Sequence, residues 1–367
     1  MHPFHAGARL TIDLKAIADN WRALAQLAQP GACGAAVKAD AYGLGLEPVS
    51  RALWAAGCRT FFVALPDEAF ALRAVLPDAE IYCLGGLTPG GAADYLAHTI
   101  TPVLNSLADV EAWIAQAPGV HTALHVDTGM NRLGLRVAEA ETLALNSSAM
   151  ERLNLRYVMS HLACADEPDH PLNSQQIQRF ASVCALFPGV AGSLSNSAGT
   201  LLGGAYVHDL ARPGIALYGG ASAPIDPNPI QPVVQLDARI LQVRQAYKGE
   251  PVGYGAAQTL SRDTRLAILG VGYADGYHRL AGSSDAAAGS TAKITGHNAP
   301  FVGRISMDLI AIDISEPHFD HVTAGDFATL IDRETTVDGV AKAAQTIGYE
   351  VLTSLGRRYH RDYINDI

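Results

Sequence analysis

Residues 33–84 read CGAAVKADAYGLGLEPVSRALWAAGCRTFFVALPDEAFALRAVLPDAEIYCL. Two segments of this stretch have the apolar spacing of helices, residues 48–56 and 66–75. Three short apolar runs flank them and have the length and composition of buried strands: residues 33–37, 61–64 and 81–84. Short apolar strands that alternate with helices are typical of a parallel sheet built from βα units.

The same rhythm extends on both sides of this stretch. An amphipathic helix is predicted over residues 14–27. Further apolar runs follow at residues 100–104, 122–126, 153–159, 190–194 and 215–217. Eight strand candidates in about 220 residues predict an α/β (β/α)8 TIM barrel. An open doubly wound sheet is the alternative, but its G-x-G-x-x-G fingerprint is missing after the first strand.

The pattern changes after residue 220. Residues 221–232, ASAPIDPNPIQP, carry four prolines and have the composition of an extended linker. Beyond it, short β-branched runs predict strands at residues 233–243, 266–272, 292–295, 309–314 and 327–331. Only residues 337–347 and 350–358 have helical spacing. We therefore expect two domains, a barrel over residues 1–222 and a mainly β domain over residues 231–367.

Composition narrows the possible partners. The 367 residues include 36 acidic and 26 basic side chains, a formal net charge of -10, which argues against binding to nucleic acid or to an anionic membrane. The apolar runs are far shorter than the roughly 20 residues of a membrane helix, and the N-terminus has no signal-peptide pattern. Five scattered cysteines without a C-x-x-C pair favour reduced thiols in the cytoplasm and no metal site.

Polar residues follow several of the predicted strands. The carboxyl ends of barrel strands converge on one mouth, where the active sites of TIM barrels lie. A lysine, arginines, a histidine and a hydroxyl beside glycine amides suit a small anionic ligand, and a desolvated lysine can form a Schiff base with a carbonyl. These residues are Lys38, His125, Asp127, Arg132, His161, Asp166, Asn196, Ser197, Arg212, Gly214 and Ile215.

Seven motifs give the chain a resemblance to the alanine racemases over nearly its whole length. The resemblance implies an isomerase that interconverts L- and D-alanine with pyridoxal 5'-phosphate, on a TIM barrel joined to a C-terminal β domain. In order, the motifs are AVKADAYG (36–43), DTGMNRLG (127–134), NSAG (196–199), RPGIALYG (212–219), VGYG (252–255), GYADGY (272–277) and VGRISMD (302–308).

The resemblance also implies roles for single residues. Lys38 would hold the cofactor as a Schiff base and act as one of two bases. Arg212 would face the pyridine nitrogen, and His161 would lie against the ring. Arg132 would contact both the cofactor's phenolic oxygen and the substrate carboxylate. The remaining cofactor-binding positions, mostly around the phosphate, would be Tyr42, Asn196, Ser197, Gly214 and Ile215.

The second domain would complete the site. Tyr254 would be the base on the opposite face, and Tyr273 and Met307 would contact substrate. Because family members place this tyrosine against the barrel of a partner, the resemblance implies a head-to-tail homodimer. Polar positions of an access corridor would be Asp166, Arg279, Arg304 and Asp308.

Two departures from the family pattern stand out. His125 occupies the place where many members carry a carbamylated lysine that orients the arginine, so we hypothesise that a chloride, a water or Asp127 orients Arg132. Near the end the chain reads LGRRYHRDY, where Arg357 or Tyr359 takes the place of the family's tyrosine.

Three alternative functions stay open at this point. The first is a racemase of broader specificity that also accepts serine. The second is an amino-acid decarboxylase of the same architecture, although its cysteine motif is missing here. The third is a single-barrel pyridoxal-phosphate carrier, which the predicted second domain argues against. The sequence leaves open whether the chain makes D-alanine for the cell wall or degrades it.

Overall fold

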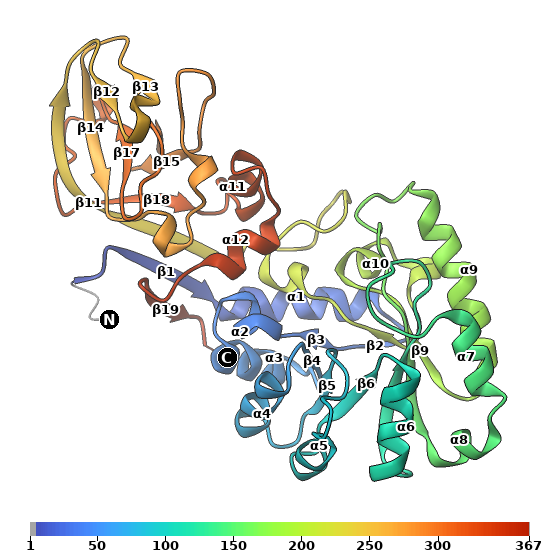
Figure 1. Ribbon diagram of the computed structural model, residues 1–367. Coiled ribbons are helices and arrows are strands. Elements are labelled where there is room, and N and C mark those ends of the chain that lie inside the picture. The colour runs from blue at the N-terminus through green and yellow to red at the C-terminus, as the bar shows by residue number, and fades with distance from the viewer. Residues whose placement is uncertain (1–4, 367) are drawn as a thin grey trace. The chain divides into compact units, whose positions relative to one another are not determined.

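The computed structural model describes residues 5–366 (Figure 1). These residues divide into two compact units, and the first comprises Ile17–Gln231. The second comprises Pro232–Asp366 together with the described residues before Ile17. The boundary after Gln231 falls in the proline-rich segment 221–232, and the described residues before Ile17 group with the second unit.

The first unit has the predicted βα rhythm, with helices following most of the strands (Figure 1). Its strands are β2 (Ala32–Cys33), β3 (Ala35–Ala36), β4 (Thr60–Val63), β5 (Glu80–Cys83), β6 (Thr101–Leu104), β7 (His121–His125), β8 (Asn154–Met159), β9 (Ala191–Ser193) and β10 (Leu210–Ala211). Its helices are α1 (Leu14–Leu27), which begins at the end of the other unit, α2 (Lys38–Tyr42), α3 (Leu46–Ala56), α4 (Pro66–Val75), α5 (Ala92–Ala97), α6 (Leu107–Gln116), α7 (Val137–Ala144), α8 (Ser147–Arg152), α9 (Pro171–Leu186) and α10 (Ser197–Leu202).

The strands close into a barrel. Strands β3 to β9 form one parallel sheet in sequence order, and β10 pairs in parallel with β2. Strands β2 and β3 are one strand interrupted at Gly34, whose N–H donates to Ala211 O at 2.9 Å. On the other side of β10, Ser193 Oγ donates to Leu210 O at 2.6 Å and Arg212 N–H donates to Ser195 O at 2.9 Å. The TIM-barrel prediction is therefore confirmed.

The eighth strand is not where the sequence pattern placed it. Residues 215–217 lie in a 3-10 helix, η3 (Ile215–Tyr218), and the eighth strand is the two-residue β10 just upstream. Pro213 ends the run after β10, and the chain turns again at Gly219, whose φ is 80°. Residues 215–217 therefore have the apolar composition of a strand but the conformation of a 3-10 helix.

The second unit is mainly β, as predicted. A mixed sheet has the order β16-β15-β18-β11-β1-β19, and β14 joins β11 to β17. The strands are β1 (Ala8–Asp13), β11 (Val234–Ala246), β12 (Pro251–Val252), β13 (Gln258–Thr259), β14 (Thr264–Leu269), β15 (Thr291–Ile294), β16 (His297–Pro300), β17 (Ile310–Asp313), β18 (Phe327–Ile331) and β19 (His360–Ile364). The helices are α11 (Val337–Ala343) and α12 (Gly348–Ser354). Short 3-10 helices interrupt both units: η2 (Gly204–Tyr206), η4 (Tyr254–Ala256), η5 (Tyr273–Asp275), η6 (Arg279–Ala281) and η7 (Pro317–Phe319).

Strand β1 explains why the N-terminus belongs to the second unit. It pairs antiparallel with β11, from Ala8 opposite Ala238, and parallel with β19, from Arg9 opposite His360. Its side chains alternate between buried and half-buried, as expected for a strand with one face on a core. The two ends of the chain therefore meet in one sheet.

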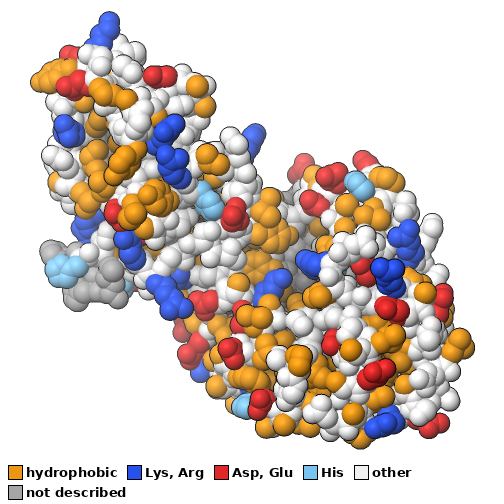
Figure 2. Space-filling model, viewed as in Figure 1, with side chains coloured by type: hydrophobic (Ala, Val, Ile, Leu, Met, Phe, Trp, Pro, Cys, Tyr) orange, Lys and Arg blue, Asp and Glu red, His pale blue; other side chains and the backbone are white. Residues whose placement is uncertain are grey.

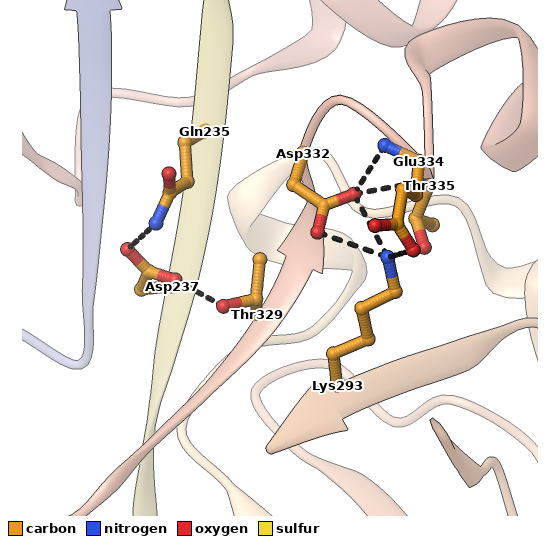
Figure 3. A network of polar contacts seen from close by, with 7 residues as sticks. All are labelled: Gln235, Asp237, Lys293, Thr329, Asp332, Glu334 and Thr335. Carbon is orange, nitrogen blue, oxygen red and sulfur yellow. Dashed lines mark hydrogen bonds and ion pairs between the residues drawn. The ribbon is translucent and has the colours of Figure 1, made fainter. Parts of the chain in front are cut away.

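A polar network fixes the turn after β18 (Figure 3). Lys293 Nζ pairs with Asp332 Oδ2 at 3.1 Å and with Glu334 Oε2 at 2.6 Å. Asp332 Oδ1 also accepts the N–H of Thr335 at 2.6 Å. These bonds join β15 to the turn that leads into α11, so we interpret this cluster as structural.

No helix within residues 5–366 is both long enough and apolar enough to span a membrane.

Candidate active site

The predicted site residues of the barrel follow successive strands at their carboxyl ends. Lys38 comes after β3, Arg132 after β7, His161 after β8, Ser197 after β9 and Arg212 after β10. Since these strands are parallel, the residues converge on one mouth of the barrel. The contacts described below connect them.

Lys38 begins an unusual turn. The next four residues, Ala39 to Tyr42, all have φ between 52° and 56°, so α2 is a single left-handed turn. This conformation costs about 1–2 kcal/mol per residue for side chains other than glycine. Strain of this kind persists where surrounding contacts impose it, and it is common at functional sites.

The environment of the Lys38 amine favours its neutral form. Burial lowers the pKa of Lys38, the Arg132 guanidinium lowers it further, and the Glu68 carboxylate raises it. Within residues 5–366 the amine has no hydrogen-bond or ion-pair partner. A half-buried lysine of lowered pKa is a suitable nucleophile for a carbonyl carbon.

A cradle for a small anion forms opposite this turn. Ser197 Oγ accepts the N–H of Gly214 at 2.8 Å and that of Ala216 at 3.2 Å. These two bonds occupy the lone pairs of the hydroxyl, so its proton remains available to a ligand. The buried N–H of Ile215 also lacks an acceptor among the described residues.

Gly214 allows Tyr42 to reach this cradle. A Cβ on Gly214 would lie only 2.2 Å from Tyr42 Oη, so a side chain there would displace the hydroxyl. The Tyr42 ring is buried and stacks on Tyr218, with 4.6 Å between ring centroids. Hydroxyl and amide donors that converge in this way suit a phosphate group.

Asn196 caps the helix that carries Ser197. Its Oδ1 accepts the N–H of Gly199 at 3.0 Å, so Asn196 caps helix α10. The cap sets the start of the helix and hence the position of Ser197. Asn196 thus supports the cradle through its neighbour, and direct contact with a ligand stays a prediction.

The buried Arg212 lies beside the half-buried His161. Arg212 Nη2 donates to Ser160 O at 2.6 Å and lies 3.5 Å from His161 Nδ1, and Nη1 donates to Ser193 Oγ. Burial lowers the pKa of Arg212 to about 10, so the guanidinium is still protonated at neutral pH. Burial and the Arg212 charge hold the pKa of His161 well below its usual range, and the ring is neutral.

Arg132 is presented by a tight loop. Asp127 Oδ1 accepts the N–H of Gly129 at 2.7 Å and of Met130 at 2.8 Å, and Asp127 N–H donates to Leu135 O at 2.8 Å. Asp127 therefore shapes the loop and, in the described chain, makes no ion pair with Arg132. The exposed guanidinium keeps its donors for a ligand.

His125 is a neutral ring in a fixed tautomer. Asn105 Nδ2 donates to Leu84 O at 3.1 Å and to Val103 O at 3.0 Å, which orients the amide. Asn105 Oδ1 therefore accepts from His125 Nδ1 at 2.8 Å, so the proton is on Nδ1 and the Nε2 lone pair is free of it. Burial, then the Arg212 charge, lowers the pKa of His125 to about 4.

This lowered pKa predicts acid sensitivity. The unfolded chain protonates His125 as the pH falls through about 6.5, and the folded chain does so only near a pKa of about 4. The contribution of the neutral ring to the free energy of unfolding is therefore fully present above pH ~6.5. It is lost as the pH falls toward the folded-state pKa, and the loss is on the order of 3 kcal/mol. We expect His125→Asn, which keeps a donor for Asn105, to flatten the pH dependence of the urea midpoint.

The control for this variant is His121→Asn, an exposed histidine at the other end of β7. We expect it to leave the pH dependence unchanged. His161 has the same direction of shift, so part of the acid sensitivity should persist in His125→Asn. If His125→Asn and wild type lost stability equally between pH 6.5 and 4, the neutral state of this ring would be disproved.

Tyr254 lies in the second unit, on a glycine-rich turn. Gly253 and Gly255 have φ of 76° and 70°, and a Cβ on Gly255 would lie 2.8 Å from Arg304 Nη1. The turn therefore packs against Arg304 and presents the Tyr254 ring with 70% of its surface exposed. A cavity of about 420 Å³ opens beside the turn, lined in part by Val252, Arg304 and Leu309.

Tyr273 and Met307 are adjacent on the same unit. Tyr273 N–H donates to Ser306 O at 3.1 Å, and Ala274 N–H donates to Met307 O at 2.9 Å. Both side chains are exposed, at 40% and 53%. Figure 2 shows hydrophobic and cationic side chains close together on the visible face of this unit. The motif at residues 302–308 therefore contacts two other motifs, VGYG (252–255) and GYADGY (272–277).

Arg358 connects these loops by hydrogen bonds, and the sequence analysis did not predict this role. Its Nε and Nη2 donate to the two oxygens of Asp275 at 2.6 and 2.8 Å, and Nη1 and Nη2 donate to Asp308 Oδ1 at 2.8 Å. Asp275 Oδ2 also accepts the N–H of Gly272 at 2.9 Å. The arginine therefore ties the segment of Tyr273 to that of Met307.

The other residues of the tail and of the predicted corridor are mostly at the surface. Of the two residues proposed to replace the family's tyrosine, Tyr359 is buried and its hydroxyl has no partner among the described residues, whereas Arg357 is exposed. The corridor residues are exposed, and Asp308 is held by Arg358: Asp166, Arg279, Arg304 and Asp308.

Comparison with known proteins places this arrangement in a family. Residues 12–222 match the family model described as alanine racemase, N-terminal domain, and residues 233–363 match alanine racemase, C-terminal domain. Alanine racemases from Methylobacterium sp. (strain 4-46) and Rhizobium meliloti (strain 1021) are 49% and 45% identical. Each alignment covers 98% of this chain, with 98% and 97% of the relative.

A solved structure has the same fold. The crystal structure of alanine racemase from Bartonella henselae with covalently bound pyridoxal phosphate superposes with a TM-score of 0.92 at 39% identity. The superposition covers 98% of this chain and 100% of that one. The chain therefore belongs to the alanine racemase family of pyridoxal-phosphate-dependent isomerases.

Proposed function

We propose that this chain interconverts L- and D-alanine by a two-base mechanism in which Lys38 and Tyr254 exchange the α proton. The observation that carries the proposal is the Lys38 amine, which has a lowered pKa and no partner among the described residues, at a barrel mouth that also holds Arg132 and Arg212. The barrel supplies one base and the second unit the other.

The barrel mouth fits pyridoxal 5'-phosphate. Ser197 has a proton to donate, and Tyr42 Oη reaches the same cradle beside Gly214. The buried N–H of Ile215 has no acceptor within residues 5–366. These donors would hold the phosphate, and Lys38 would join the aldehyde. Bound in this way, the cofactor supplies an electron-withdrawing ring that weakens the α C–H bond of an attached amino acid.

Arg212 would limit how strongly that ring withdraws electrons. Its guanidinium keeps its proton at neutral pH, and Nε–H has no acceptor within the described chain, so it is available to the pyridine nitrogen. A group that donates a hydrogen bond without releasing a proton leaves that nitrogen unprotonated. The neutral His161 ring would then lie against the cofactor without adding a charge.

The proposed substrate is a small α-amino acid. Arg132 is exposed and has no partner in the part of the chain that the structure describes, so its guanidinium suits a carboxylate. The aromatic and thioether side chains of Tyr254, Tyr273 and Met307 would leave room for little more than a methyl group. Packing alone discriminates a methylene or hydroxyl group by about 1–3 kcal/mol, so serine is expected as a minor substrate.

Tyr254 is proposed to act on the opposite face of the substrate from Lys38, within a head-to-tail homodimer. Removing a proton from one face and returning it to the other is simplest with two groups. The exposure of Tyr254 and the cavity beside its turn support a partner chain on this surface. The family resemblance supports the same arrangement.

A cytoplasmic location is proposed for the chain. The cysteines Cys33, Cys58, Cys83, Cys164 and Cys184 are all free thiols, and burial raises the pKa of Cys33 and Cys58. Unreactive, reduced thiols are typical of a reducing compartment. Fractionation of the source cells with an antibody against the chain would test this location.

A panel of L-amino acids tests the proposed reaction. We expect the chain with added pyridoxal phosphate to convert L-alanine to D-alanine fastest, L-serine at a lower kcat/KM, and larger residues at background rate. Chiral chromatography measures the products, and a carbon dioxide assay on the same samples tests the decarboxylase alternative. Carbon dioxide release without D-amino acid would refute the proposal.

A further inference from the structure

The search for further function centres on the carboxylate of Glu68. This residue lies in the first turn of α4, outside every motif by which the chain resembles its family. Its two oxygens accept three backbone N–H groups from two different segments.

One oxygen holds the turn of the catalytic lysine. Glu68 Oε1 accepts the N–H of Ala39 at 2.6 Å, the residue directly after Lys38 and the first of the left-handed turn. The other oxygen accepts the N–H of Ala64 at 2.8 Å and of Leu65 at 3.1 Å, where β4 ends. The carboxylate therefore ties the turn after β3 to the end of the neighbouring strand.

Within residues 5–366, the other hydrogen bonds of the turn do not connect Ala39 to a neighbouring strand. Asp40 Oδ1 accepts the N–H of Leu46 at 2.7 Å, and Gly43 N–H donates to Ala39 O at 2.8 Å. These bonds lie within the turn and its own continuation into α3. The bond from Glu68 is the one side-chain contact, among the described residues, that joins the N–H of Ala39 to another element.

Charge adds a second effect. Two charged groups act on the pKa of Lys38, Arg132 after β7 and Glu68 on α4, and the Lys38 charge in turn lowers the pKa of His161 after β8. Glu68 is the anion of this set, and it opposes the effect of Arg132 on the amine. We propose that Glu68 is a positioning residue for Lys38, which holds the lysine's turn by hydrogen bonds and balances the charge of Arg132. This inference rests on the role proposed above for Lys38.

Glu68→Gln removes both the charge and some of the hydrogen bonds. Two measurements then show whether Glu68 positions Lys38 or only contributes to folding. The amide keeps the shape but places an NH2 group against N–H donors on one side, and it removes the charge. In the holoenzyme we expect pyridoxal phosphate to dissociate about tenfold faster, as for the loss of one or two charge-assisted hydrogen bonds. The pH profile of Lys38 acetylation, measured by mass spectrometry after cofactor release, should shift to lower pH because an anion is lost.

Two further variants complete the experiment. Glu68→Asp keeps the charge but shortens the reach, so the acetylation profile should stay near wild type while the cofactor still dissociates faster. Glu47→Gln is the matched control, because Glu47 also lies in a first helical turn, on α3, but its ion pair is with the exposed Arg51. It should match wild type in both measurements.

The outcomes distinguish the possible roles of Glu68. A lower melting temperature with unchanged cofactor release and an unchanged acetylation profile would make Glu68 merely structural and overturn the proposal. If Glu68→Gln did not fold, Glu68→Asp would decide through its rate of cofactor release. A wild-type chain that binds no pyridoxal phosphate would refute the proposed function, and the acetylation profile would still test Glu68.

Discussion

Lys38→Ala is expected to abolish racemisation, with kcat/KM falling by roughly 10⁴-fold or more. The amine has two tasks in the proposed mechanism, since it joins the cofactor and moves the α proton on one face. The visible absorbance of the lysine-bound cofactor should disappear with it. Both losses follow from the Lys38 amine at the barrel mouth, whose pKa is lowered by burial and by Arg132. Spectra and chiral chromatography of the purified variant measure them.

Two companions make the Lys38 result specific. Lys38→Arg keeps a positive charge but cannot form a carbon–nitrogen double bond with the aldehyde at neutral pH, so it should be as inactive as Lys38→Ala. Lys342→Ala removes an exposed lysine of α11 and should retain colour and activity. A colourless wild type that cannot be reconstituted with pyridoxal phosphate would contradict the whole assignment.

Tyr254→Phe is expected to lose activity mainly in the direction that starts from L-alanine, by roughly 10²–10⁴-fold. The substitution removes only the hydroxyl that carries the proton, and the ring still packs on its glycine-rich turn. The lysine-bound cofactor should therefore keep its absorbance. Proton NMR in deuterium oxide measures loss of the α proton from L-alanine. Unchanged exchange in this variant would remove Tyr254 from its proposed role.

Mixing the two inactive variants tests the shared site. If Tyr254 acts on the barrel of a partner, a heterodimer of Lys38→Ala and Tyr254→Phe chains contains one intact site and one doubly altered site. With random exchange of subunits half of the dimers are heterodimers, so about one quarter of all sites are intact and about one quarter of the wild-type activity returns. Tyr247→Phe, an exposed tyrosine of the same unit, is the control and should be fully active alone. No recovery after verified exchange would argue for sites built from single chains.

Much of the barrel was predictable because its strands are buried and its helices amphipathic. Helices α1 and α4 have the predicted bounds, and strand β18 also matches its prediction residue by residue. The eighth strand was not predictable in this way, because Leu210 and Ala211 are too few to form a pattern. Residues 215–217 have strand composition, but they form a 3-10 helix in which the N–H of Ala216 donates to Ser197 Oγ, a contact that is distant in sequence.

The long-range pairing of strand β1 could not be predicted from the sequence either. The segment ARLTID alternates apolar and polar residues and could have been identified as a strand, yet nothing local indicates that Ala8 pairs with Ala238. Adjacent position in sequence suggested the barrel instead. The assignment of the N-terminus to the second unit therefore depends on a sheet whose strands come from both ends of the chain.

The site residues were predicted from motifs, and their supporting residues were not. Glu68 and Arg358 act through partners that are distant in sequence: Glu68 binds Ala39, 29 residues away, and Arg358 binds Asp275, 83 residues away. A carboxylate or a guanidinium alone carries no sign of such a partner. Asn105 is similar, because only its two carbonyl contacts fix the tautomer of His125.

The most direct test of the account is the optical rotation of alanine solutions with the chain and pyridoxal phosphate. Starting from pure L-alanine and, separately, from pure D-alanine, both rotations are predicted to decay to zero, because the enantiomers have equal free energies. In deuterium oxide, each conversion should place deuterium on the α carbon. A chain that carries bound pyridoxal phosphate but leaves both rotations unchanged would contradict the account.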